Sequence, residues 1–344
     1  MPNPSVIPAI VDDHRDVVEQ AIRDQMERSS NSLPLYRMMQ YQLGWVDQQG
    51  AEEITHTTPR FYGGVCMEAS RADEATRQVG PEAGAAAVEL LTASLAVHEE
   101  MESAAQSADA RPSVWWVWGP AQAINVGDGL HALARLAIFQ LRGTDAPAEL
   151  TLSAMSILDA AALRYYEGQY LELTYQERVD ITEEQYLKMA EAKRGALLGA
   201  AVALGARTTG ADEARVEAFR AFGECLGVAS QIYDDVALIW TEGGAARDSG
   251  RVLNKSKLFP VAYALEHAAI SQKRALGNIY FKRVMEPSDI PALRDVLDVL
   301  DTREKSLQRA ASLADQAVAL LKPARLSDAA MARWESVAAA LVGR

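Results

Sequence analysis

Residues 224–240 read ECLGVASQIYDDVALIW, and this stretch decides the fold class. Together with the residues just before it, it carries an apolar stripe whose members are three or four positions apart. The stripe consists of Phe219, Phe222, Leu226, Ala229, Tyr233 and Val236. Such spacing marks the buried face of an α-helix. Because Asp234 and Asp235 lie among these apolar residues, where an unpaired carboxylate would be costly, the stretch predicts a buried helix that carries a polar site.

The rest of the chain also has helical character. Alanine is abundant, Gly and Pro cluster between long stretches, and no window alternates as a strand would. Thr182 and Gln185 form a capping box at one expected helix start, and Gly205 stands where that helix could end. The expected helices include residues 12–29, 82–106, 119–142, 149–176, 182–205, 212–240, 257–284 and 289–322.

Neither repeats nor low-complexity linkers divide the chain. The simplest organisation is therefore a single all-α domain over residues 1–344. We expect residues 1–10, and also 242–252, to be mobile.

Composition and charge exclude several classes of protein. The formal net charge is −13 and no Lys/Arg-rich run is present, so no nucleic-acid partner is expected. The most apolar segment, 121–141, is interrupted by polar residues and is too polar to span a bilayer. The beginning of the chain does not read as a signal peptide, and Cys66 and Cys225 fit reduced thiols. These features favour a cytoplasmic protein.

A second acidic cluster lies in residues 88–103, which read VELLTASLAVHEEMES. Glu99 and Glu102 are three positions apart and share a helix face, with Glu100 between them. Such a face opposite that of Asp234 and Asp235 would present the oxygen ligands that Mg²⁺ requires. The ion would then bridge a substrate's phosphates and neutralise the charge of a leaving group. The alternative is that EEMES is an ordinary solvated helix face.

Six strings in this order resemble the trans-isoprenyl diphosphate synthase family across residues 55–265. They are AVELLTASLAVHEE (87–100), ARPSVWWVWGPAQAINVGDGLHALA (110–134), GQYLEL (168–173), KRGAL (193–197), QIYDD (231–235) and NKSKLFPVAYALE (254–266). The resemblance implies a class I isoprenoid synthase helical bundle with a central cavity. It also implies a prenyl diphosphate substrate, Mg²⁺ as cofactor and a homodimer.

The resemblance assigns roles to individual residues. Lys193 matches a lysine that contacts the donor diphosphate, and Gln231, Asp234 and Asp235 match the second metal-binding face. The metal ligands it implies are Glu99, Glu100, Glu102, Asp234 and Asp235. The substrate-binding residues it implies are Lys255, Lys257, Arg247 or Arg251, Gln169, Trp115, Trp118, Tyr170 and Ser94. The small Ser94 favours a deep pocket for a C15–C20 or longer chain, whereas each aromatic residue could instead serve only helix packing.

The departures from the family pattern fall in both aspartate-rich motifs and on the acceptor side. Both aspartate-rich motifs lose their fifth-position carboxylate, at Ser103 and Leu238. The basic motif that grips isopentenyl diphosphate reads GGVCMEA (63–69), without a single cation, and Ala108 and Asp109 replace an arginine pair. Head-to-tail chain elongation is therefore not expected.

Two kinds of function remain. The first is ionisation of one allylic prenyl diphosphate, followed by cyclisation, elimination or transfer to an acceptor that lacks a diphosphate. The second is a catalytically silent partner subunit of an active polyprenyl diphosphate synthase, and a divergent chain-elongating prenyltransferase is a further alternative. Metal binding by Glu99, Glu102, Asp234 and Asp235 would distinguish an enzyme from a silent subunit.

Overall fold

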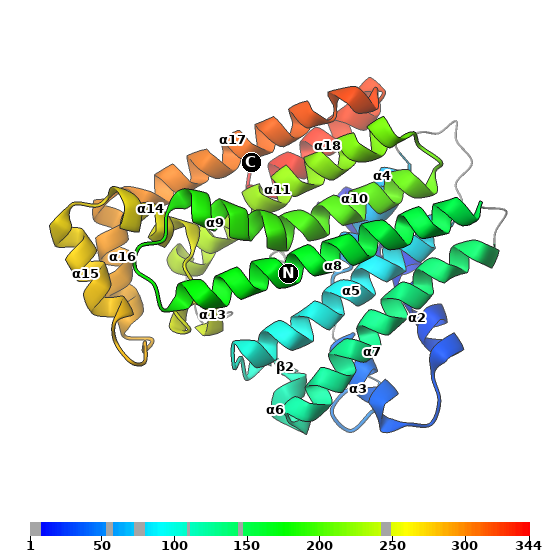
Figure 1. Ribbon diagram of the computed structural model, residues 1–344, viewed down its shortest axis with the longest axis horizontal. Helices are drawn as coiled ribbons and strands as arrows, with labels where there is room; N and C mark the ends of the chain where they lie inside the picture. The colour runs from blue at the N-terminus through cyan, green and yellow to red at the C-terminus, as the bar shows by residue number, and fades with distance from the viewer. Residues whose placement is uncertain (1–7, 53–57, 72–79, 109–110, 144–146, 242–248) are drawn as a thin grey trace.

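The computed structural model describes residues 8–52, 58–71, 80–108, 111–143, 147–241 and 249–344. Within this part of the chain almost all regular structure is helical, as predicted (Figure 1). The helices of the first half are α1 (Ala9–Asp12), α2 (Arg15–Ser29), α3 (Pro34–Gln42), α4 (Phe61–Ser70), α5 (Pro81–Glu102), α6 (Val114–Trp118), α7 (Pro120–Ile138), η2 (Phe139–Gly143) and α8 (Ala148–Gln176). Those of the second half are α9 (Glu183–Ala190), η3 (Glu191–Gly195), α10 (Ala196–Thr208), α11 (Glu213–Trp240), α13 (Ser249–Leu253), α14 (Phe259–His267), α15 (Ile270–Tyr280), α16 (Asp289–Val299), α17 (Thr302–Leu320), η4 (Lys322–Ala324) and α18 (Asp328–Ala340). The strands β1 (Ser107–Ala108) and β2 (Arg111–Pro112) form one short antiparallel pair.

Helices α4 and α10 form the middle of the bundle. All ten residues of α4 are buried, and Arg207 is the one residue of α10 that is not. A helix that is apolar all round must be covered on every side, and α10 packs against α4, α5, α8 and α11. The prediction that Gly205 ends this helix is wrong, because α10 continues to Thr208. A Cβ atom at Gly205 would lie 2.1 Å from the carbonyl oxygen of Cys66, so this glycine lets α10 approach α4.

Glycines also bring the segment η3–α10 against α11. A Cβ atom at Gly223 would lie 2.6 Å from the carbonyl oxygen of Leu198, and one at Gly227 would lie 2.6 Å from that of Arg194. Backbone therefore meets backbone along this contact. It sets the π-helical turn η3 beside the helix that carries Asp234.

A smaller apolar cluster lies at the far end of the molecule, around α14, α15 and α16 (Figure 1). The predicted helix 257–284 is divided there, since Ala268 is extended between α14 and α15. Helix α14 packs against α9, α11 and α17, whereas α15 packs mainly against α16. The predicted helix 289–322 is divided at Asp301, whose φ of 52° is left-handed.

Two further expectations concern a helix start and segments thought to be mobile, and the mobility itself stays a prediction. The capping box is confirmed, because the Gln185 amide N–H donates to Thr182 Oγ1 at 3.2 Å and the Thr182 N–H donates to Gln185 Oε1 at 3.0 Å. Of the segments expected to be mobile, residues 1–7 and 242–248 lie outside the described residues, whereas Ala9 and Ile10 belong to α1 and residues 249–253 form α13. Among the described helices, none has the length and apolar character of a membrane span.

Candidate functional site

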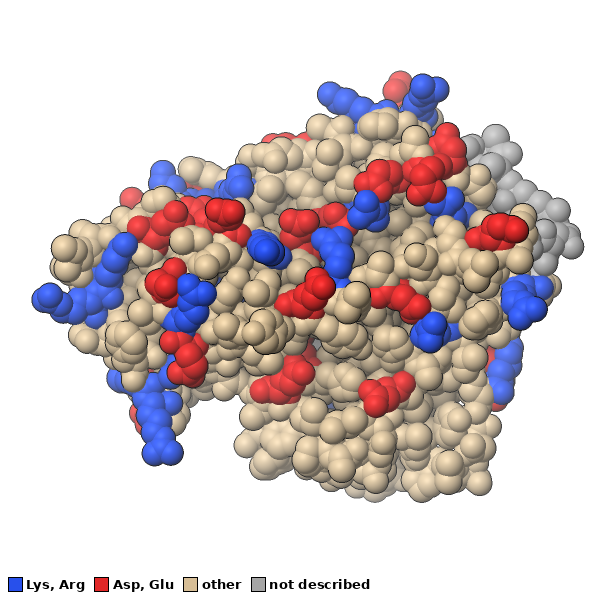
Figure 2. All heavy atoms as spheres, viewed as in Figure 1, with Lys and Arg blue, Asp and Glu red and all other residues tan. Residues whose placement is uncertain are grey.

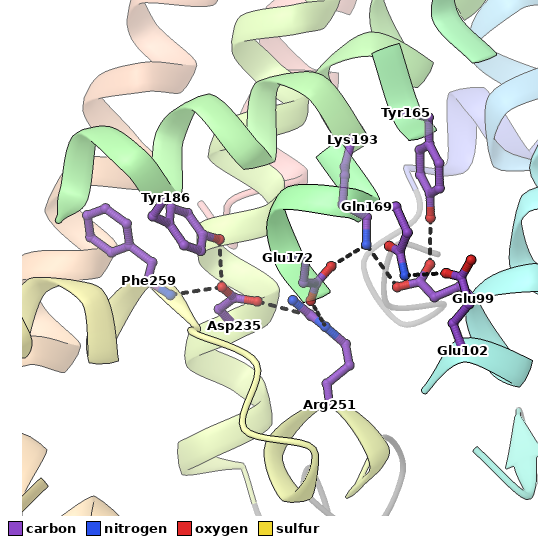
Figure 3. Close-up of polar contacts among 10 residues, drawn as sticks. All are labelled: Glu99, Glu102, Tyr165, Gln169, Glu172, Tyr186, Lys193, Asp235, Arg251 and Phe259. Carbon is purple, nitrogen blue, oxygen red and sulfur yellow. Dashed lines mark hydrogen bonds and ion pairs between the residues drawn. The ribbon is translucent and has the colours of Figure 1, made fainter. Parts of the chain in front are cut away.

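Helices α5 and α8 face each other through a set of polar side chains (Figure 3). Tyr165, Gln169 and Glu172 follow the i, i+4, i+7 spacing of one face of α8. The Tyr165 hydroxyl donates to Glu99 Oε2 at 2.5 Å, and Gln169 Nε2 donates to Glu102 Oε2 at 2.7 Å. The predicted shared face of Glu99 and Glu102 therefore exists and points toward α8.

Lys193 is the buried cation of this site. It lies in η3, is 4% exposed, and its Nζ donates to Glu99 Oε1 at 3.0 Å and to Glu172 Oε2. Burial alone would raise the pKa of Glu99, but Lys193 and the Tyr165 hydroxyl bring that pKa down to about 2. Burial likewise disfavours the charged lysine, yet Glu172 and Glu99 raise its pKa above the ordinary value. Glu99 and Lys193 are thus both charged at neutral pH.

The next residue along, Arg194, binds a carboxylate of a different helix. Its Nη1 donates to Oδ2 of Asp234 on α11, and the two side chains are only 11% and 14% exposed. Consecutive residues of an α-helix point about 100° apart. Lys193 and Arg194 are consecutive in η3 and therefore bind carboxylates on different sides of the same site.

Asp235 is fully buried and is held by three donors (Figure 3). Arg251 Nη1 donates to Oδ1 at 3.1 Å, while the Tyr186 hydroxyl at 2.6 Å and the Phe259 amide at 2.9 Å donate to Oδ2. Burial raises the pKa of Asp235 although Arg251, Tyr186 and the Phe259 amide oppose it. In this arrangement Asp235 ties α9, α13 and α14 to α11, which differs from its predicted place on a metal-binding face.

We call these residues together the charged centre. It comprises Glu99, Glu102, Glu172, Lys193, Arg194, Asp234, Asp235 and Arg251. Arg251 also approaches Glu172, with 3.7 Å between its Nε and Oε1 of that residue. Five carboxylates thus face three cationic side chains, so the centre has a surplus of negative charge.

The charged centre suits Mg²⁺ only in part. Glu99 and Asp234 are partly exposed and Glu102 is exposed, and all three offer the hard oxygen ligands that Mg²⁺ prefers. Asp235 does not fit, since both of its oxygens accept from protein donors. In the described part of the chain, the one group of three potential ligands that already converge is Glu183, Glu266 and His267. That group lies on α9 and α14, and none of its members is Glu99, Glu102 or Asp234.

The predicted phosphate-binding lysines differ in placement. Lys257 is buried, and its Nζ donates to the carbonyl oxygens of Gln176 and Lys255, at 2.8 Å each. Burial and then Lys255 lower the pKa of Lys257 to about 7. It fastens the chain before α14 rather than facing the charged centre, whereas Lys255 remains partly exposed. Arg247 lies outside the described residues.

The aromatic residues predicted to bind the substrate make other contacts in the described structure or lie at its surface. Trp115 Nε1 donates to the carbonyl oxygen of Ala105 at 2.6 Å, and Trp118 packs edge-on against Tyr41 with 4.9 Å between ring centroids. Tyr170 is 70% exposed on α8. These placements correspond to the helix-packing alternative for the two tryptophans and to a surface position for Tyr170.

The remaining predicted residues are buried or lie close to the site. Ser94 is buried on α5, one turn and a half before Glu99, and Gln231 is buried one turn before Asp235. Glu100 is partly buried, about 100° around α5 from Glu99.

The residues that match the acceptor-diphosphate motif, 63–69, are buried in the core. Glu68 is 2% exposed and accepts from His14 Nε2 at 3.1 Å and from Arg333 Nε at 2.7 Å. Burial would raise its pKa, but these two hydrogen bonds keep it below the ordinary value. Cys66 is fully buried against Gly84 and Gly205. The positions that resemble an acceptor-diphosphate motif thus serve packing and an internal ion pair.

Sequence reasoning missed three residues of the site. Glu172 was quoted only as part of GQYLEL, although its spacing from Gln169 and Tyr165 signals a shared face. Arg194 and Tyr186 carry no local signal, because their partners lie 40 and 49 positions away.

Comparison with known proteins identifies the family of the chain. The model of the polyprenyl synthetase family matches residues 65–297, which is more than half of the chain. A geranylgeranyl diphosphate synthase of Mycobacterium tuberculosis is 30% identical over 281 residues, covering 80% of this chain and 76% of its own. A short chain isoprenyl diphosphate synthase of Methanothermobacter thermautotrophicus is 29% identical over 250 residues, covering 68% and 76%.

The solved structures agree as well. A polyprenyl synthetase from Streptomyces coelicolor A3(2) superimposes with a TM-score of 0.86 at 26% identity, over 97% of this chain and 99% of that one. Its fold is the all-α isoprenoid synthase bundle, as is the fold described above. The chain therefore belongs to the polyprenyl synthetase family.

Proposed function

We propose that the chain binds one allylic prenyl diphosphate at the charged centre and ionises it without condensing it with isopentenyl diphosphate. The observation that carries this proposal is the placement of Glu68. This carboxylate is buried and binds His14 and Arg333, at a position where the family motif has a cation. Among the described residues at this position, the cationic side chains His14 and Arg333 are both occupied by Glu68, which disfavours a second diphosphate there. On the donor side, Lys193 and Arg194 remain.

Ionisation breaks the bond between the allylic carbon and the diphosphate oxygen, and the electron pair leaves with the diphosphate. Lys193, Arg194 and the partly exposed Lys255 would donate to the phosphate oxygens. Mg²⁺ bound by Glu99, Glu102 and Asp234 would neutralise the charge that develops on the leaving group. The ring of Tyr165, whose centroid lies 5.3 Å from Lys193 Nζ, offers an aromatic face beside the donor site.

The carbocation then cyclises, loses a proton or passes to an acceptor without a diphosphate. A C15–C20 or longer donor is supported by the small, buried Ser94 on α5. It is also in keeping with the names of the relatives, which include a geranylgeranyl diphosphate synthase.

The test is a product assay with purified protein, Mg²⁺ and C10, C15, C20 and C25 diphosphates, each with and without isopentenyl diphosphate. We expect a hydrocarbon or alcohol from the donor alone and no longer prenyl diphosphate in any mixture. Robust chain growth by the isolated protein would contradict the proposal.

One observation favours the second candidate, a catalytically silent subunit. Glu99, Asp234 and Asp235 are all bound to cationic side chains of the protein itself, so these three potential metal ligands are already paired. A silent subunit would release no product alone and would change the output of an active prenyl synthase on mixing. The low net stability of buried ion pairs argues against the silent-subunit function. Apolar side chains in the same places often stabilise a fold as much as such pairs do, or more.

We also propose that the chain pairs with a second copy through α7 and α8. Seven large apolar side chains are exposed on α7, on α8 and on the adjoining turn η2, and the surface over α6 and α7 shows few charges (Figure 2). They are Ile124, Leu136, Phe139, Leu152, Leu163, Tyr166 and Tyr170. An apolar face of this extent is typical of an interface.

A further inference from the structure

Helix α15 has one face that the rest of the described chain leaves uncovered. Ile270, Arg274 and Phe281 are spaced four and then seven positions apart, so they fall on one side of the helix. Ile270 is 77% exposed, and Phe281, which follows the last helical residue, is 71% exposed. Leu276 and Ile279 on the other side are buried. The helix therefore presents two large apolar side chains and a cation together on its outer face.

The turn after α15 extends this surface. Val284 is 68% exposed, and the two cations before it are exposed as well. Residues 269–284 contain four cations and no acid, although the formal net charge of the whole chain is −13. Figure 2 shows Lys and Arg side chains projecting at the end of the molecule that α15 forms in Figure 1. We call this the basic apolar surface, which consists of Ile270, Lys273, Arg274, Phe281, Lys282, Arg283 and Val284.

Two of the four cations are not used by the fold. Lys282 forms an ion pair with Asp289 at 2.5 Å, and Lys273 donates to a backbone carbonyl oxygen at 3.1 Å. Among the described residues, none pairs with Arg274 or Arg283. Free guanidinium groups beside exposed apolar side chains suit a partner that is both anionic and apolar.

A lipid bilayer with anionic head groups has both properties. Apolar side chains enter the boundary between head groups and acyl chains, while Lys and Arg keep their charges at the level of the phosphates. The core of a protein–protein interface, in contrast, is poor in charged residues. We propose that the basic apolar surface docks the protein reversibly on a bilayer that contains anionic lipids, with Ile270 and Phe281 inserted among the head groups. This docking does not depend on the reaction proposed above.

The basic apolar surface lies at the end of the bundle that carries the second acidic pair. Trp240, the last residue of α11, donates from Nε1 to Oδ1 of Asp298 on α16 at 2.7 Å, and α15 packs against α16. Asp234 and Asp235 lie on the same final turns of α11. A docked protein would therefore hold this end of α11 close to the bilayer.

Co-sedimentation of the full chain with sucrose-loaded vesicles tests the docking. One set of vesicles is phosphatidylcholine alone, and the other contains about one third phosphatidylserine. A chain with a net charge of −13 is repelled as a whole by an anionic surface, so binding requires a local basic region. We expect the wild type to sediment with the phosphatidylserine vesicles only. Raising NaCl from about 0.1 M to about 0.5 M should release it, because salt screens the attraction.

Two double variants separate the contributions of charge and apolar contact. Arg274→Gln with Arg283→Gln removes both unpaired cations and should weaken binding about tenfold or more, at about fivefold for each cation near the surface. Ile270→Ser with Phe281→Ser keeps the charges and should also weaken binding, and the remaining binding should stay sensitive to salt. All four side chains are exposed, so circular dichroism should show the wild-type helix content.

Lys322→Gln with Arg325→Gln is the matched control for charge. Both residues are exposed, and η4 lies by the first turn of α11, where Arg215 Nε donates to the carbonyl oxygen of Ala324 at 3.0 Å. The net charge changes by the same amount as in the arginine variant, but at the opposite end of α11 from Trp240. Vesicle binding should therefore equal that of the wild type.

Several outcomes would overturn the proposal. The first is a wild type that does not sediment with phosphatidylserine vesicles, or that binds both kinds of vesicle equally. The second is an equal loss of binding in the control and in the arginine variant, which would make total charge the cause. Unchanged binding after Ile270→Ser with Phe281→Ser would show that these side chains do not enter the bilayer. If soluble polyglutamate binds the wild type but vesicles do not, the surface serves an acidic protein and the bilayer is the wrong partner.

Discussion

Glu89 on α5 shows how one buried carboxyl group couples the fold to pH. It is 2% exposed and accepts from the Gly63 amide at 2.8 Å, which caps the first turn of α4. Burial raises its pKa from 4.5 to about 7, even though Arg60 and the Gly63 amide oppose the shift. The folded state therefore favours the protonated group.

This shift predicts a loss of stability as pH rises. Because the folded-state pKa lies above the unfolded one, the contribution is complete below about pH 4.5 and is lost as pH rises through about 7. The full loss is about 3 kcal/mol at 1.36 kcal/mol per pKa unit. Urea unfolding at pH 4.5, 6 and 8 should show the stability difference between wild type and Glu89→Gln changing by roughly this amount. A difference independent of pH would show that Glu89 does not titrate in this window.

Asp235 should matter more to stability than an exposed aspartate in a similar pair. In Asp235→Asn the side chain is neutral and keeps one acceptor oxygen, which cannot serve Arg251 together with the Tyr186 hydroxyl and the Phe259 amide. We expect a loss of about 3–5 kcal/mol in the free energy of unfolding, measured with urea. Asp180→Asn removes a partner of Arg178 at the surface and should cost less than about 1 kcal/mol. Equal effects would contradict a structural role of Asp235.

The sequence predicts which acidic residues belong to the site but not which partners they bind. Asp234 and Asp235 are adjacent and read as two equivalent metal ligands, yet one pairs with Arg194 and the other with Arg251, Tyr186 and the Phe259 amide. Those partners come from four different segments. Which of them meets which oxygen depends on how the helices pack, and no local pattern records that.

At the scale of elements, the contact between α11 and the segment η3–α10 holds the donor side together. Gly227→Ala would place a Cβ atom 2.6 Å from the carbonyl oxygen of Arg194, and backbone cannot yield cheaply. We expect a loss of about 1–3 kcal/mol, or more, in the free energy of unfolding.

The control for this change is Gly143→Ala. A Cβ atom there meets no atom of the described structure within 4 Å, so the free energy of unfolding should change by less than about 0.5 kcal/mol. If both alanine variants unfold at the same urea concentration as the wild type, close backbone approach is not what limits α11.

Helix boundaries could be predicted from the sequence where the interactions that set them are local. The capping box at Thr182 was predictable because its two hydrogen bonds join residues three positions apart. The break at Ala268 was not, since alanine favours a helix and α14 packs against α9 and α17, which lie far from it in the sequence. Gly205 was misread as a stop because a glycine that ends a helix and one that admits another helix look alike in sequence.

At the scale of the whole molecule, the apolar surface of α7 and α8 should decide the oligomeric state. Leu163 is 62% exposed near the middle of α8, and Leu163→Glu would place a charge in the proposed interface. Sedimentation should show a dimer for the wild type and a monomer for the variant. Phe281→Glu alters a residue that is 71% exposed beyond α15 and should remain a dimer. A monomeric wild type would remove the dimer proposal.

The π-helical turn η3 has a consequence for how such a site can change over time. A π turn holds one more residue than an α turn, so its presence is equivalent to a single inserted residue between α9 and α10. Deleting Ala192 would restore the α-helical period and rotate α9 by about 100° relative to α10. Tyr186 would then leave Asp235, although α10 would keep its register against α4 and α11. Insertion or deletion of one residue at this point could thus change which side chains face the charged centre, while the packing of the surrounding bundle stayed the same.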